Sequence, residues 1–180
     1  MNHFRFTWAN LLTSIRALVI APTVYCIVQH YWVAAATLFT AAVITDFLDG
    51  KLARRLHQTS AFGGLFDHAT DALFVSLGCW AIAQLGMINT LLPWLIPIAF
   101  LQYVLDSKAL AGVALRMSAI GKSNGVAYYA ILGTAIGSEL LQWQWLAEPI
   151  RWVAWALVVT TILSMLDRGL TLWRTIAANR

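Results

Sequence analysis

Apolar stretches of about 20 residues, separated by short polar breaks, make up almost the whole of this chain. An α-helix needs about that length to cross the roughly 30 Å hydrocarbon core of a bilayer. Of the 180 residues, 60% are hydrophobic and only 11% are charged, whereas about a quarter of the residues of a soluble domain are charged. The sequence therefore predicts an all-α membrane protein with a single domain over residues 1–180.

The apolar pattern predicts six transmembrane helices, over residues 11–29, 31–56, 63–84, 92–112, 125–141 and 150–172. A short amphipathic opening precedes them and is typical of a helix that lies along the membrane interface; it contains His3, Phe4, Arg5, Phe6 and Trp8. The first apolar run continues beyond any small-residue cleavage site, so we interpret it as a span and not as a cleaved signal peptide.

Basic residues fall almost entirely on one side when the six spans are threaded alternately. That side holds Arg5, Arg16, Lys51, Arg54, Arg55, Lys108, Arg116, Lys122, Arg168, Arg174 and Arg180, and the other side holds Arg151 alone. Because basic loops face the cytoplasm, we expect a multi-pass protein of the inner or cell membrane with both termini cytoplasmic. Orientation also accounts for the net charge of +4, so we expect no nucleic-acid partner.

Half of the acidic residues, four of eight, lie in one stretch between the second and third spans. Asp46 and Asp49 share one helix face, and Asp67 and Asp71 share a face of the next helix. A carboxylate in a membrane helix costs about 2.5 to 3.5 kcal/mol, and converging carboxylates repel one another. Oxygen ligands suit Mg²⁺ or Mn²⁺, and two such ions would balance four carboxylates. The sequence therefore predicts a divalent metal site.

Small residues accompany these carboxylates and leave room for a ligand to approach the backbone; they are Gly50, Ala53, Gly63 and Gly64. Arg54 offers a planar donor suited to phosphate. A plainer interpretation is that the carboxylates are solvated or paired with the basic side chains at positions 51, 54 and 55. The spacing of four aspartates together with the glycines favours the metal site. His68 is offset by about 100° from Asp67 on the helix, which predicts that its ring turns away from the carboxylates.

The stretch from Asp46 to Asp71 matches, at all eight fixed positions, the pattern D-x-x-D-G-x-x-A-R-x8-G-x3-D-x3-D. In this it resembles the CDP-alcohol phosphatidyltransferase family. The segment from Asn10 to Arg16 is also similar to the family's N-L-x-T-x-x-R opening, although Ala9 stands where proline is usual. The plan of six spans looks like that family as well.

The resemblance implies that Asp46, Asp49 and Asp67 bind two metal ions, and that Asp71 is a shared ligand and the general base. It implies that the CDP moiety is held by Gly50, Ala53, Arg54 and Gly63. The metals would stabilise CMP as it leaves, while Asp71 takes the proton of the acceptor hydroxyl that attacks the β-phosphorus. The expected reaction transfers a phosphatidyl group from CDP-diacylglycerol to a small alcohol within phospholipid biosynthesis.

The acceptor is less well defined by the sequence. Lys108, Arg116 and Lys122 gather near the expected cytoplasmic ends of the fourth and fifth spans, where they either hold an acceptor phosphate or orient the helices. Family members that use a phosphorylated acceptor often carry a G-K-x-x-T-like segment, from which the stretch Gly121–Gly125 departs. Glycerol 3-phosphate is the preferred acceptor, and inositol phosphate, serine and other alcohols stay open.

Two other classes of protein fit this sequence less well. A small cation-binding membrane transporter would need carboxylates near the bilayer midplane in both halves of the chain, whereas here they concentrate at one surface. A catalytically inactive scaffold would not need four intact aspartates. The sequence leaves open the acyl-chain preference, the choice between Mg²⁺ and Mn²⁺, and whether the protein forms a homodimer.

Overall fold

The computed structural model describes residues 8–55, 61–107 and 119–178, and it describes side chains over 11–48, 63–107 and 120–171. These residues form helices and no strand: α1 (Trp8–Val28), α2 (Trp32–Arg55), α3 (Ala61–Gln84), α4 (Leu92–Asp106), α5 (Ala119–Leu140) and α6 (Ala147–Ala178), with a short 3-10 helix η2 (Gln144–Leu146) before α6. The prediction of an all-α protein is confirmed.

Most helix bounds agree with the prediction, and the differences lie in the second half of the chain. α4 ends at Asp106, six residues before the predicted end at 112. α5 begins at Ala119, six residues before the predicted start at 125, and α6 continues to Ala178, past the predicted end at 172. A helix can extend beyond its apolar segment because its backbone hydrogen bonds are internal. The predicted interfacial helix falls largely on residues 1–7, outside the described residues, and Trp8 is the first residue of α1.

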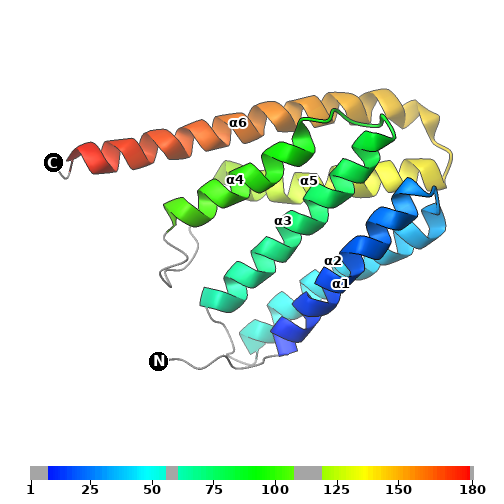
Figure 1. Cartoon of the computed structure of the whole chain (residues 1–180), viewed down its shortest axis with the longest axis horizontal. Helices are drawn as coiled ribbons and strands as arrows, with labels where there is room; N and C mark the ends of the chain where they lie inside the picture. Colours follow the sequence, from blue (N-terminus) through cyan, green and yellow to red (C-terminus); the bar gives the residue numbers. More distant parts are fainter. Residues whose placement is uncertain (1–7, 56–60, 108–118, 179–180) are drawn as a thin grey trace.

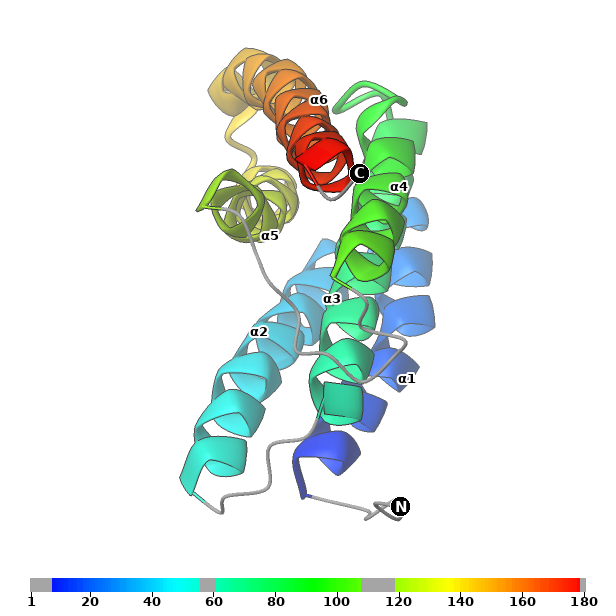
Figure 2. The ribbon, with the colours of Figure 1, turned by 90° about the vertical axis from the view of Figure 1, so that its left-hand side faces the viewer.

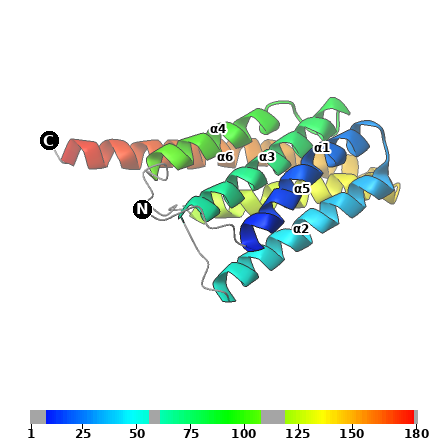
Figure 3. The ribbon, with the colours of Figure 1, turned by 60° about the horizontal axis from the view of Figure 1, so that its bottom comes forward.

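The helices run back and forth along one long direction (Figure 1). The connections α1–α2, α3–α4 and α5–α6 lie at one end of the bundle, while α1 begins and α6 ends at the opposite end (Figure 1). α1 packs on α2 and α3, α6 packs on α5 and α4, and the two groups meet through the contacts of α3 with α4 and of α5 with α2 and α3. Figures 2 and 3 show these two groups from two further directions.

Glycines bring α5 close to the helices of the first group. A Cβ atom on Gly78 of α3 would lie 2.5 Å from Leu132 Cδ2, and one on Gly133 of α5 would lie 2.7 Å from Phe39 Cε1. Such close approach through small residues is typical of helix packing in membranes. Leu132 and the neighbouring Ile136 are completely or almost completely buried. The close contact fixes the position of α5 beside the polar residues of α2 and α3.

Two segments of the described chain are long and apolar enough to cross a membrane, Leu11–Val28 and Gln144–Thr171. Trp32–Leu48 and Leu92–Asp106 are apolar but shorter. In α3 the carboxylates of Asp67 and Asp71 interrupt the apolar sequence. The six α-helices of the described residues agree in number with the prediction. Six membrane crossings stay a prediction.

Candidate active site

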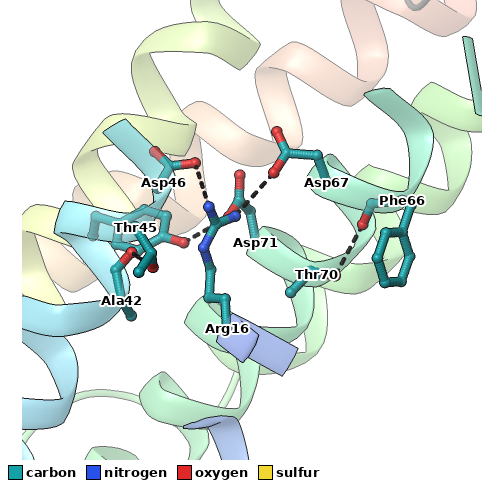
Figure 4. Close-up of polar contacts among 9 residues, drawn as sticks. Arg16, Ala42, Thr45, Asp46, Phe66, Asp67, Thr70 and Asp71 are labelled. Atoms are coloured by element: carbon teal, nitrogen blue, oxygen red, sulfur yellow. Dashed lines mark hydrogen bonds and ion pairs between the residues drawn. The ribbon is translucent and has the colours of Figure 1, made fainter. Parts of the chain in front are cut away.

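Three carboxylates from α2 and α3 converge on one arginine of α1 (Figure 4). Arg16 Nη2 lies 3.2 Å from Asp46 Oδ1, and Arg16 Nη1 lies 3.0 Å from Asp67 Oδ1 and 2.7 Å from Asp71 Oδ1. The Arg16 side chain is completely buried, whereas the exposed fractions of the three aspartate side chains are 42%, 28% and 22%. The cluster therefore has a buried cation at its base and acidic groups that solvent or a ligand can reach.

Asp71 is held from two sides. The hydroxyl of Tyr129 on α5 donates a hydrogen bond of 2.9 Å to Asp71 Oδ1, the same oxygen that accepts from Arg16. The Tyr129 ring stacks on Phe74, with ring centroids 5.8 Å apart and an interplanar angle of 14°. This packing orients the hydroxyl. Because both donors engage Oδ1, neither of these hydrogen bonds is made to the second oxygen of the carboxylate, Oδ2.

The acidic cluster has the charge and the ligand atoms that a divalent cation requires. The three carboxylates and the one guanidinium of this cluster have a combined formal charge of −2. One atom each of Asp67, His68 and Asp71 lies within 4.8 Å of the others, a spacing that suits one ion. A set dominated by carboxylate oxygens suits Mg²⁺ or Mn²⁺. These residues therefore fit a divalent ion.

The position of His68 corrects the prediction made from helical periodicity. Its ring nitrogen belongs to the same group as the oxygens of Asp67 and Asp71, and the ring lies 6.5 Å from that of Tyr103. An offset of 100° between adjacent residues separates their Cα–Cβ directions but still allows a long side chain to reach a neighbour's ligand. His68 therefore belongs to the site.

A cavity of about 360 Å³ adjoins the carboxylates and extends among α2 to α6. Asp46, His68 and Asp71 form part of its wall, and Lys122 and Arg168 form another part. The remaining wall is largely apolar and comes from Val75, Ile96, Ala99, Phe100, Val126 and Met165 among others. A cavity of this size with a few polar groups is typical of a small-molecule site.

Two cations on the cavity wall come from the second group of helices. Lys122 lies in the first turn of α5 and is exposed. Arg168 of α6 is largely buried; its Nε lies 3.4 Å from Asp106 Oδ2, and its guanidinium carbon lies 4.7 Å from the centre of the Tyr103 ring. A contact of 3.4 Å is long for an N–H···O hydrogen bond. This contact uses Nε, so the Nη groups of Arg168 retain donors that a ligand can use.

The predicted site residues differ in how far the structure describes them. Asp46, Asp67 and Asp71 come together, and Lys122 lies on the same cavity. Gly63 lies in the first turn of α3. Asp49, Gly50, Ala53 and Arg54 lie in α2, but their side chains are outside the described residues. Lys108 and Arg116 are outside the described residues altogether.

Sequence reasoning placed Arg16 and Arg168 only among the orientation charges, and not in the site. For Arg16 a signal was available, since it closes the N-L-x-T-x-x-R segment. For Arg168 no such signal exists, because its place on the cavity depends on how α6 rotates against α4 and α5.

A sequence model of the family described as CDP-alcohol phosphatidyltransferase matches residues 6–165. The chain belongs to the CDP-alcohol phosphatidyltransferase family, as the resemblance in its sequence predicted.

Three known proteins similar to this chain are named CDP-diacylglycerol–glycerol-3-phosphate 3-phosphatidyltransferase. The protein of Escherichia coli K12 is 28% identical over 173 residues, which cover 94% of this chain and 91% of the relative. The chloroplastic and mitochondrial protein 1 of Arabidopsis thaliana is 31% identical over 162 residues, 81% of this chain and 52% of the relative. A Pseudomonas fluorescens protein is 37% identical over 78 residues, 42% of this chain and 40% of the relative. The chain thus spans about half of the Arabidopsis protein and a smaller part of the Pseudomonas protein.

Proposed function

We propose that this protein transfers a phosphatidyl group from CDP-diacylglycerol to glycerol 3-phosphate and releases CMP. The observation that carries the proposal is one cavity whose wall holds carboxylates of the family signature, Asp46 and Asp71, and two cations, Lys122 and Arg168. The similar proteins of E. coli and Arabidopsis are named for this transfer. A small phosphorylated alcohol complements the two cations. The diphosphate of CDP-diacylglycerol would be bound through divalent ions that the carboxylates hold.

The proposed location is a cell membrane that the six helices span, with the active site and both termini on the cytoplasmic side. Many large apolar side chains lie on the outer surface of the bundle; Leu18 is 76% exposed and Trp152 is 72% exposed. Hydrocarbon is the environment that favours such a surface. Lys122 and Arg168 lie toward the end where α6 finishes, whereas Arg151 lies near the start of α6. This distribution supports the orientation by the positive-inside bias.

Divalent ions, Mg²⁺ or Mn²⁺, would be held by Asp46, Asp49, Asp67 and Asp71 and would supply charge neutralisation to the diphosphate and to the leaving CMP. Gly50, Ala53, Arg54 and Gly63 would hold the CDP moiety. Two ions fit the four-aspartate signature. His68 lies close enough to Asp67 and Asp71 to join the ligands.

Asp71 is the proposed general base. The acceptor hydroxyl oxygen bonds to the β-phosphorus, the bond from that phosphorus to the CMP oxygen breaks, and the hydroxyl proton passes to Asp71. Arg16 and Tyr129 both donate to Oδ1, so Oδ2 is the oxygen that takes the proton. The two donors keep the carboxylate oriented while the proton moves, which is the positioning that general base catalysis needs.

Lys122 and Arg168 are the proposed ligands of the acceptor phosphate. Arg168 presents a planar set of donors that suits phosphate oxygens, and its ring contact with Tyr103 limits its rotation. The remainder of the cavity wall is largely apolar, which disfavours bound water that would otherwise compete with the acceptor hydroxyl. Lys108 and Arg116 are proposed for the same subsite from the sequence.

The proposal is tested by incubating purified protein in Mg²⁺ with labelled CDP-diacylglycerol and, separately, glycerol 3-phosphate, inositol phosphate and serine. Released CMP and the lipid product are measured together. Phosphatidylglycerol phosphate should form with glycerol 3-phosphate at a rate well above that with the other two. Faster product formation with inositol phosphate or serine would contradict glycerol 3-phosphate as the acceptor. If no CMP is released with any of the three acceptors, the proposed transfer is wrong.

A further inference from the structure

Arg16 is a charged side chain at a position where charge is costly. It lies within an apolar helix, its exposed fraction is 0%, and two of its nitrogens contact carboxylates of α2 and α3. A buried cation of this kind is tolerated only when its partners are in place, and removing one member of such a cluster leaves the others uncompensated. Arg16 therefore ties three helices together through charge as well as through packing.

The carboxylates that contact Arg16 are also the expected ligands of a divalent ion. Arg16 Nη1 contacts Oδ1 of both Asp67 and Asp71, and both residues belong to the group that could hold an ion. A guanidinium and a metal ion that share carboxylates repel each other and compete for the same lone pairs. The contacts of Arg16 with these carboxylates must therefore influence how strongly the carboxylates bind a metal ion.

We propose that Arg16 is a positioning residue that serves as the internal counter-ion of the acidic cluster. It holds Asp46, Asp67 and Asp71 near one another without a metal ion, and it weakens metal binding because it supplies part of the positive charge. This role rests on the metal site of the proposed function. It gives the protein an acidic site that stays folded between cycles of substrate and metal binding.

A protein without this counter-ion should depend on metal for its stability. In Arg16→Met the three carboxylates repel one another in chelator, and a divalent ion then supplies the positive charge that Arg16 supplies in the wild type. Arg16→Lys keeps one charge, but a compact ammonium cannot contact three carboxylates as a planar guanidinium does. The dependence of stability on metal in Arg16→Lys should therefore fall between that of the wild type and that of Arg16→Met.

The first test measures the unfolding midpoint of detergent-solubilised protein in chelator and in excess Mg²⁺, without substrate. The gain in midpoint with Mg²⁺ should increase from wild type to Arg16→Lys to Arg16→Met. Arg151→Met is the matched control, because Arg151 is 53% exposed and pairs with Glu148 by a contact of 2.7 Å. Its gain should equal that of the wild type. Equal gains in all four proteins would overturn the proposal.

If Arg16→Met does not fold in either condition, the comparison of wild type with Arg16→Lys decides. A larger gain in the Lys variant supports the role of Arg16, and an equal gain overturns it.

A second measurement separates this inference from the proposed function. Mn²⁺ binding without substrate is followed by the electron paramagnetic resonance signal of free Mn²⁺. The Kd should be lower in the Arg16 variants, by roughly tenfold for Met, because a repelling charge is gone. Binding in wild type with an unchanged Kd in the variants overturns only the role of Arg16. A wild type that binds no Mn²⁺ overturns the metal centre and this inference with it.

Discussion

The two groups of helices bring opposite charges to the shared cavity. α1, α2 and α3 supply three carboxylates gathered on a buried arginine, whereas α5 and α6 supply Lys122 and Arg168. Arg16 is enclosed by its carboxylate partners, while Arg168 makes one long contact with Asp106. The difference supports the proposal that charge in the first group serves metal and donor binding, and that charge in the second group serves acceptor binding.

This division explains why the reaction and the acceptor are defined to different degrees. The signature that places the chain in its family lies wholly in α2, α3 and the residues between them. The segment that often accompanies a phosphorylated acceptor departs from its usual pattern at the start of α5. If the proposed roles hold, variation in the second group would change the acceptor while the first group kept the chemistry of transfer.

The largest effect should come from the first group, at Asp71. Asp71→Asn preserves the shape of the side chain but removes the basic carboxylate, so kcat should fall by about 10² to 10⁴-fold with the donor KM little changed. Steady-state rates measured over a range of donor and Mg²⁺ concentrations check this. Asp167→Asn is the matched control, since Asp167 is exposed on α6 and does not line the cavity. A near-normal kcat in Asp71→Asn, or full recovery with added Mg²⁺, would reduce Asp71 to a metal ligand.

A smaller effect, of a different kind, should come from the second group. Lys122→Met and Arg168→Met each remove a charge from the cavity wall, and the acceptor KM should rise by about 10- to 100-fold, as expected for loss of one charge-assisted hydrogen bond. The donor KM should change little, because donor binding belongs to the first group. Acceptor and donor titrations of both variants separate the two constants.

If both Met variants keep a normal acceptor KM, the second group of helices does not bind the acceptor phosphate through these cations. Lys122 and Arg168 would then be orientation charges. A rise in the donor KM as large as that in the acceptor KM would contradict the division as well. Unfolding midpoints of the variants serve as a control, because Arg168 also packs on Tyr103.

The features that repeat along a single helix could be predicted from the sequence. Apolar length predicted the helices, and the spacing of Asp67 and Asp71 predicted their shared face. Contacts between helices were harder to predict: the burial of Arg16, the approach of Tyr129 to Asp71, and the place of Arg168 on the cavity. Helices that are apolar on most faces do not reveal which face packs inward. Those contacts depend on the rotation of each helix, to which Gly78 and Gly133 contribute through close approach.

In the proposed reaction, the acidic cluster of α2 and α3 promotes transfer of the phosphatidyl group with the help of a divalent ion. The most direct measurement is the rate of phosphatidylglycerol phosphate formation from labelled CDP-diacylglycerol and glycerol 3-phosphate, first after chelation and then after Mg²⁺ or Mn²⁺ is restored. Chelation should abolish product formation, and either ion should restore it. An unchanged rate in excess chelator would contradict a role for a divalent ion in the transfer.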